Sequence, residues 1–119
     1  EFVKRYYLEH YHHRMPNSYG HAKDLFDPAL ADSMFNTARG LMQFTNNSIT
    51  MPKQGDLLVI DGSRVNAYGH VAIVSKVGDG ELEVIQQNTG SSRDTYDLDL
   101  IDGRWRIDNK RVLGWLRMP

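Results

Sequence analysis

His70 and two amides that follow it are the side chains in this chain best suited to chemistry. A histidine ring exchanges protons near neutral pH, and an amide beside it can fix which ring nitrogen carries the proton. His70 opens the apolar run Val71–Val74, and Gln86 and Asn88 follow after a glycine-rich turn. These residue types predict the base and the orienting group of a nucleophile–base–orienter arrangement. A purely structural histidine at a strand end is the alternative.

The spacing between His70 and the amides is that of a β-hairpin. Gly78–Gly80 separates two periodic runs, as a hairpin turn does. With all three residues in the loop, Ala72 faces Gln86 and His70 faces Asn88 across the strand pair. Opposed and diagonal side chains on one face of a hairpin lie close enough for both amides to reach the ring.

A two-residue loop is the alternative register for this hairpin. It reverses the parity of the second strand and presents Gln87 rather than Gln86 to the histidine. It also buries Glu83, a charged side chain, at a cost that the first register avoids. We therefore expect the three-residue loop, with the even-numbered residues of 82–88 on the face of His70.

The composition limits the classes of function. The chain has 119 residues, of which 40% are hydrophobic and 24% charged, as expected of one globular domain. A formal net charge of −1 argues against bulk binding of nucleic acid. No apolar run is long enough to span a membrane. The absence of cysteine excludes disulfides and thiolate metal sites within these residues.

The first residues predict an amphipathic helix over Glu1–Tyr11. Its apolar positions recur at helical spacing: Phe2, Val3, Tyr6, Tyr7 and His10. No capping residue precedes this pattern, and Lys4 and Arg5 lie near the positive end of the helix dipole. We therefore expect the helix to begin before Glu1.

The remaining pattern predicts a short helix and then strands. The helix is expected over 22–26, ended by Asp27-Pro28, and the weakly patterned stretch 29–44 is expected to supply core residues. Those core residues are Met34, Phe35, Leu41, Met42 and Phe44. Strands are expected at 56–60, on both sides of the hairpin turn, at 96–100, at 105–107 and at 112–116. Helices followed by mostly antiparallel strands predict an α+β domain.

Four histidines near the first helix raise the question of a metal site. They are His10, His12, His13 and His21. Their spacing fits no zinc pattern, and no cysteine accompanies them. We expect a solvated, partly stacking cluster, with neither a metal nor a cofactor.

With these elements placed, the chain resembles the CHAP family of cysteine- and histidine-dependent amidohydrolases and peptidases. Four landmarks occur in the family's order: Glu1–Arg5, Gly20–Asp24, Pro52–Asp56 with Gly69–Ile73, and Gln86–Asn88. The tail Leu113–Trp115 is also similar to the end of the bacterial glutathionylspermidine amidase domain, which suggests that subgroup. Each motif alone is short, but together they span essentially the whole chain.

The resemblance implies a papain-like α+β fold, with N-terminal helices packed on an antiparallel β-sheet. Residues 1–119 would form a single amidase domain that begins within its first helix. The family's nucleophilic cysteine would lie two residues before Glu1, where a helix start lowers the pKa of a thiol. The family often has a glutamate at the position of Gln86. An amide oxygen can still accept the Nδ1–H of the histidine, but it cannot offset the charge of an imidazolium.

The resemblance also implies an activity, the cleavage of an amide bond through a thioester acyl-enzyme. His70 would act as base and then as acid, Gln86 would orient its ring, and Asn88 would line the site or share that role. Residues that would bind a substrate carboxylate are Lys4, Arg5 and Tyr19. The substrate would be a peptidoglycan peptide or a small glutathionylspermidine-like conjugate. The first implies a secreted or periplasmic protein and the second a cytoplasmic one.

Two other functions stay open at this point. The first is a binding module that keeps the CHAP fold without a nucleophile, since these residues contain no cysteine. The second is a serine hydrolase using Ser18, Ser63 or Ser75, although no nucleophile-elbow pattern surrounds any of them.

The resemblance predicts that a cysteine stands two positions upstream of Glu1 in the encoded protein. Intact mass and N-terminal sequencing of the parent protein measure this directly. Any other residue at that position would leave only the binding-module function.

Overall fold

The computed structural model describes residues 2–12, 22–64, 69–87 and 91–119. They include one α-helix, α1 (Phe2–Tyr11), and a four-residue 3-10 helix, η1 (Ala22–Leu25). The strands are β1 (Met34–Asn36), β2 (Leu41–Thr45), β3 (Leu57–Ile60), β4 (His70–Gly78), β5 (Glu81–Gln87), β6 (Ser91–Ile101), β7 (Arg104–Ile107) and β8 (Val112–Arg117). None of the helices in the described ranges is long and apolar enough to cross a membrane.

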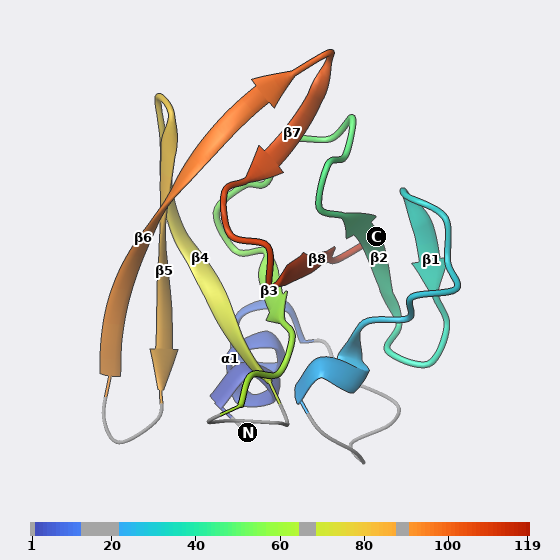
Figure 1. The fold of residues 1–119 in the computed structure, drawn as a ribbon. Coiled ribbons are helices and arrows are strands. Elements are labelled where there is room, and N and C mark those ends of the chain that lie inside the picture. Colours follow the sequence, from blue (N-terminus) through green and yellow to red (C-terminus); the bar gives the residue numbers. More distant parts are fainter. Residues whose placement is uncertain (1, 13–21, 65–68, 88–90) are drawn as a thin grey trace.

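The strands form one eight-stranded antiparallel sheet in the order β1-β2-β8-β3-β4-β5-β6-β7 (Figure 1). β4, which begins with His70, lies between β3 and β5, so the prediction of a central strand is confirmed. The expected antiparallel sheet is confirmed as well. The expected second helix is only the single 3-10 turn η1.

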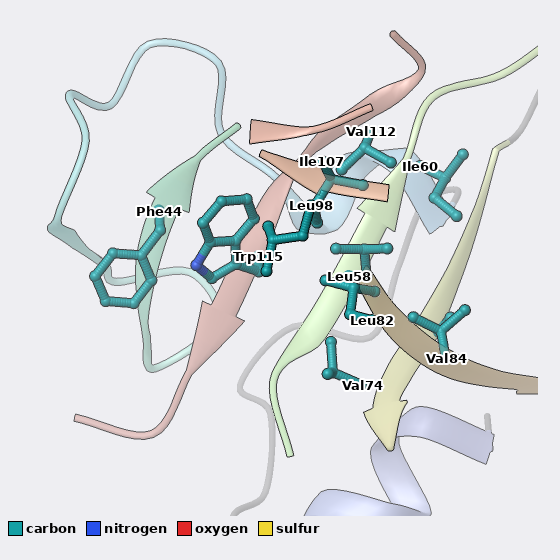
Figure 2. Close-up of a cluster of buried hydrophobic side chains, with 11 residues drawn as sticks. Phe44, Leu58, Ile60, Val74, Leu82, Val84, Leu98, Ile107, Val112 and Trp115 are labelled. Carbon is teal, nitrogen blue, oxygen red and sulfur yellow. The ribbon is translucent and has the colours of Figure 1, made fainter. Parts of the chain in front are cut away.

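One face of the sheet curls around an apolar core. The buried side chains of this core are Phe44, Leu58, Ile60, Ala72, Val74, Leu82, Val84, Leu98, Ile107, Val112 and Trp115. Figure 2 shows them converging from several strands. Leu98 and Ile107 come from the β6–β7 hairpin, so the far end of the sheet folds over the core. Each fully buried aliphatic side chain contributes roughly 1.5–3 kcal/mol to folding.

The opposite face of the sheet carries α1 and η1. Successive residues of a strand point to opposite faces, so β3 sends Leu57 and Val59 to this side and Leu58 and Ile60 to the other. Tyr7 of α1 is fully buried against the first pair. β3 is therefore buried on both faces, as expected for a central strand.

Asn46 joins the end of β2 to the far end of the curled sheet. Its Nδ2 donates to the carbonyl oxygens of Ile107 at 3.1 Å and Val112 at 3.2 Å. Its Oδ1 accepts from the Ile107 N–H at 2.9 Å. Ser48 then forms an antiparallel bridge with Trp105 of β7. These bonds hold the sheet in its curled shape around the core.

The β4–β5 hairpin has a two-residue turn, so the expected three-residue loop is wrong. Gly78 pairs with Glu81, which leaves Asp79 and Gly80 in the turn. Gly80 has a φ of 76°, a conformation that glycine adopts without strain. The sequence Asp-Gly is a common two-residue hairpin turn, and here this local preference determines the loop length.

A β-bulge at Ser75 shifts the pairing by one residue. As a result, the even-numbered residues of β5 face the core, as the three-residue loop would have placed them. The register shifts between Val74 and Lys76, and from there Val74 pairs with Val84. Leu82 and Val84 therefore enter the same core as Val74. The Ser75 hydroxyl lies 2.8 Å from a carboxylate oxygen of Glu83, which stays outside the core. The expected parity of the hairpin is confirmed even though its turn is not.

The two strands that the sequence pattern did not reveal, β1 and β2, lie within residues 34–45. Leu41 and Phe44 of β2 are buried, as expected. Met34 and Phe35 of β1 are 51% and 43% exposed, so their assignment to the core is wrong. β1 is an edge strand of three residues, with neighbours on one side only.

Replacing Asn46 should destabilise the fold, because Asn46→Ala removes three hydrogen bonds and leaves an Ile107 N–H without its acceptor. We expect a loss of about 2–3 kcal/mol in the free energy of unfolding, measured by urea denaturation. Asn109→Ala is the matched control, because the Asn109 side chain accepts one exposed bond, from the Arg111 N–H. Equal losses in the two variants would show that Asn46 does not hold the sheet closed.

Candidate active site

Gly69 determines how His70 enters the sheet. Gly69 has a φ of 72°, and a Cβ on it would lie 2.3 Å from the carbonyl oxygen of Ile60. Only glycine permits this approach. The close contact lets His70, the first residue of β4, pair with Ile60, the last residue of β3. The half-buried His70 side chain therefore lies at the end of two paired strands.

Gln86 lies on the strand next to His70, on the face predicted for it. Its side chain is 7% exposed, and alternation places it with Val84, on the side of the curled core. His70 shares that side by the same alternation. The paired part of β4 and β5 ends at Ile73 and Ile85, however, and Figure 1 shows the two strands diverging beyond it. A contact between His70 and Gln86 therefore stays a prediction.

Asp94 on β6 is the residue of this region that the sequence analysis missed. Its carboxylate accepts a hydrogen bond from Nε2 of Gln86. Asp94 pairs with Val84 and Gln86 pairs with Ser92, so the bond runs diagonally across the β5–β6 ladder. Thr89-Gly90 is a typical turn sequence. Pairing the residues on either side of it as a second hairpin would have predicted that Asp94 lies close to Gln86.

The other predicted site residues are placed only in part. Asn88 and Tyr19 lie outside the described residues. Lys4 lies in α1, but its side chain is also outside the described part. Arg5, in the same helix, is exposed. Its assignment to substrate binding stays a prediction.

Tyr7 fixes the position of α1 on the sheet. Its hydroxyl lies 2.8 Å from the carbonyl oxygen of Gly55, to which it donates, and 3.2 Å from that of Leu116. Burial is the main reason why the pKa of Tyr7 is raised, so the hydroxyl stays protonated and keeps its donor. The helix also contacts β4, and Tyr7 belongs to the same buried cluster as Ile73 of that strand.

An ion pair between Asp56 and Arg117 lies beneath this helix contact. The guanidinium donates from Nε to Oδ1 at 2.7 Å and from a terminal nitrogen to Oδ2 at 2.6 Å. Asp56 is 1% exposed. Burial raises the pKa of its carboxyl, and the Arg117 guanidinium and the Lys53 N–H oppose that rise. A pair in this position is costly to break, by about 3–5 kcal/mol, because one charge would stay buried alone.

An open pocket of about 380 Å³ lies at the same junction. Its lining includes Tyr7, Tyr11, Lys53, Asp56 and Arg117. None of these is a predicted catalytic residue. Asp56 and Arg117 form an ion pair with each other. We therefore interpret the pocket as part of the helix–sheet junction and not as the candidate active site.

His10, the described histidine of the first helix, stacks on a neighbouring aromatic ring. The ring of His10 stacks on Tyr6, with centroids 4.1 Å apart and planes at 19°. Its Nδ1 lies 3.0 Å from the Tyr6 carbonyl oxygen. His13 and His21 lie outside the described residues. Among the residues that are described, no three histidine, aspartate or glutamate side chains gather as a metal ion would require.

The arrangement of a central-strand histidine, an adjacent buried amide and a docked helix can be compared with known families. The model of the CHAP domain matches residues 1–88. This chain belongs to the CHAP family. The match covers α1, the entry of β4 and all of β5, and so includes His70 and Gln86. No curated protein matches the chain in sequence.

Solved structures support the same fold. The crystal structure of Ly7917 is 20% identical, with a TM-score of 0.52 over 87% of this chain and 40% of that one. The crystal structure of the wild-type endolysin LysIME-EF1 is 22% identical, with a TM-score of 0.53 over 95% of this chain and 48% of that one. The CHAP domain here thus spans less than half the length of either protein.

Removing the Tyr7 hydroxyl should loosen the helix from the sheet. Tyr7→Phe keeps the ring in the core but leaves the Gly55 carbonyl without its donor. We expect a loss of about 1–2 kcal/mol in the free energy of unfolding, with faster amide exchange in α1. Tyr96→Phe is the control, because Tyr96 is a half-buried tyrosine on β6 and not on α1. Unchanged exchange in α1 would mean that Tyr7 does not anchor the helix.

Proposed function

We propose that this chain is the histidine-bearing part of a cysteine-dependent amidohydrolase or peptidase. The observation that carries the proposal is the CHAP match over residues 1–88, which contain His70 and Gln86. His70 begins a central strand that contacts helix α1, and Gln86 is buried on the neighbouring strand. A titratable ring, an amide that orients it and a nucleophile at a helix start would together suit attack on an amide carbonyl.

The proposed reaction passes through a thioester. A cysteine thiolate attacks the carbonyl carbon, and the carbon–nitrogen bond breaks as the imidazolium of His70 gives its proton to the leaving amine. Water then attacks the thioester while His70 accepts its proton, which releases the carboxylic acid and regenerates the thiolate. Backbone N–H groups at the helix start would hold the developing oxyanion.

The nucleophile is proposed to lie upstream of Glu1. Residues 1–119 contain no cysteine, and the family's nucleophile would fall two positions before Glu1. Tyr7 fastens α1 to the sheet close to β4, so a thiol on the opening turn of this helix would approach the strand of His70. The dipole of the helix would lower the pKa of that thiol. We take 1–119 as one domain of this kind.

Gln86 is proposed as the group that orients the imidazole, and Asn88 as a residue lining the same site. An amide oxygen accepts the Nδ1–H and leaves Nε2 to work as the base. It adds no negative charge. A thiolate–imidazolium pair carries its own counter-charge, so an amide is sufficient at this position.

Peptidoglycan peptides are the substrate class that we favour. One of the solved structures with a similar fold is that of a wild-type endolysin. Arg5 is exposed on α1, where it can bind a substrate carboxylate, and Lys4 and Tyr19 are proposed for the same role. A glutathionylspermidine-like conjugate is the second substrate to test, because of the tail Leu113–Trp115.

A binding module of the CHAP fold is the second candidate. The specific observation in its favour is that residues 1–119 hold no cysteine. Such a module would bind the same peptides and turn none over. A hydrolysis assay separates the two candidates.

We expect the parent protein with its cysteine to release amine groups from purified peptidoglycan, and residues 1–119 alone to fold without activity. In the parent, His70→Ala should abolish turnover, and Gln86→Ala should lower kcat by about 10–100-fold. His10→Ala is the control, because that ring is exposed and stacked on Tyr6. Its turnover should match that of the parent.

Two outcomes would contradict the proposed function. Hydrolysis by residues 1–119 above the buffer rate would place the nucleophile inside them. Binding of peptidoglycan by the parent without any turnover, on either substrate class, would favour the binding module.

A further inference from the structure

The hydrogen bond between Gln86 and Asp94 has a direction that bears on the site. Nε2 of Gln86 donates to Oδ2 of Asp94. Gln86 is 7% exposed, whereas Asp94 on the adjacent strand is exposed to solvent. A buried amide is thus joined to a carboxylate that water can reach.

The carboxylate determines which way the amide points. An ionised carboxylate has acceptors and no donor, so Gln86 can bind it only through its NH2 group. Oε1, on the other branch of the same amide, is then turned away from Asp94. A neutral partner at position 94 would allow either orientation. Charge-assisted bonds are also stronger than neutral ones, so Asp94 holds the amide firmly.

We propose that Asp94 is a positioning residue for the histidine base. It holds the Gln86 amide with Oε1 directed as an acceptor for the Nδ1–H of His70, and it adds a negative charge one hydrogen bond beyond that amide. This inference rests on the proposed function, in which His70 is the base. The His70, Gln86 and Asp94 positions lie on the adjacent strands β4, β5 and β6, on one face by alternation.

The charge matters because the imidazole becomes positive during turnover. A carboxylate bound to the orienting amide polarises it and makes Oε1 a better acceptor. Asp94 thereby contributes to the site without touching His70 or the substrate. The same bond also prevents the amide from rotating and offering its NH2 group to the ring.

The first test uses residues 1–119, which contain all three residues, and reads the tautomer of His70 by 15N NMR of its ring. In the wild-type chain the neutral ring should carry its proton on Nδ1. Asp94→Asn should lose that preference, because asparagine can donate to Oε1 of Gln86 and turn the amide round. Asp97→Asn is the matched control, on the same strand and exposed, and it should keep the wild-type tautomer.

The result that would overturn the proposal is a His70 tautomer that is the same in the wild-type chain and in Asp94→Asn. A wild-type ring protonated on Nε2 would overturn it as well, because Gln86 would then not be the acceptor. Backbone amide spectra of each variant establish that it is folded. A merely structural Asp94 would change stability and leave the tautomer alone.

The second test is a rescue in the cysteine-bearing parent. Asp94→Asn should lower kcat by about 3–10-fold. Gln86→Glu places two carboxylates side by side and should also lower kcat, because like charges repel at this distance. Adding Asp94→Asn to Gln86→Glu should raise kcat again, since the new amide can donate to Glu. Independent effects of the two changes would overturn the proposal.

The two tests separate the inference from the proposed function. If His70→Ala leaves turnover intact, the proposed function fails, yet the tautomer of His70 still reports whether Asp94 controls Gln86. If His70→Ala is inactive and Asp94→Asn has wild-type kcat and tautomer, the function stands and the role of Asp94 does not.

Discussion

The docking of α1 on the sheet depends on one junction, where Tyr7 meets the Asp56–Arg117 ion pair. Asp56 precedes β3 and Arg117 ends β8, so their bidentate bond joins two neighbouring strands at one end. The Tyr7 hydroxyl bonds to the carbonyl that precedes Asp56 and lies near the one that precedes Arg117. Helix, β3 and β8 are thus joined by buried polar contacts, and the loss of either charge would leave the other buried without its partner.

The β4–β5 hairpin meets a second constraint, the alternation of side chains along β5. A two-residue turn alone would have sent Glu83 into the core and Gln86 to the other face. The extra residue at Ser75 corrects this, and the Ser75 hydroxyl bonds to Glu83 on the outer side. The bulge therefore determines the burial of two side chains together, because the same parity places both Val84 and Gln86 on the core face of β5.

Local pattern in the sequence predicted the strands β3 to β8, the central position of β4 and the face of Gln86. It failed for β2, because Gln43 interrupts the apolar alternation. Gln43 is fully buried and satisfied by Asp27 and Asn36, partners that lie elsewhere in the fold. The sequence pattern also failed to predict the length of the β4–β5 turn. The two-residue turn and the bulge at Ser75 together give the same face assignment as a three-residue loop, so the two cases differ only in how the strands pair.

In the candidate site, too, some features can be predicted from neighbouring residues in the sequence and others depend on how distant strands pair. His70 is recognisable because a glycine and an apolar strand surround it in sequence. The bond between Gln86 and Asp94 crosses two strands and needs the register of the second hairpin. An amide side chain has an acceptor oxygen and a donor NH2 group. Its oxygen can accept from a histidine ring only if another group holds the NH2 group away from that ring. In the proposed site, the orienting group is therefore a property of β5 and β6 together, and the residue type at position 86 does not define it alone.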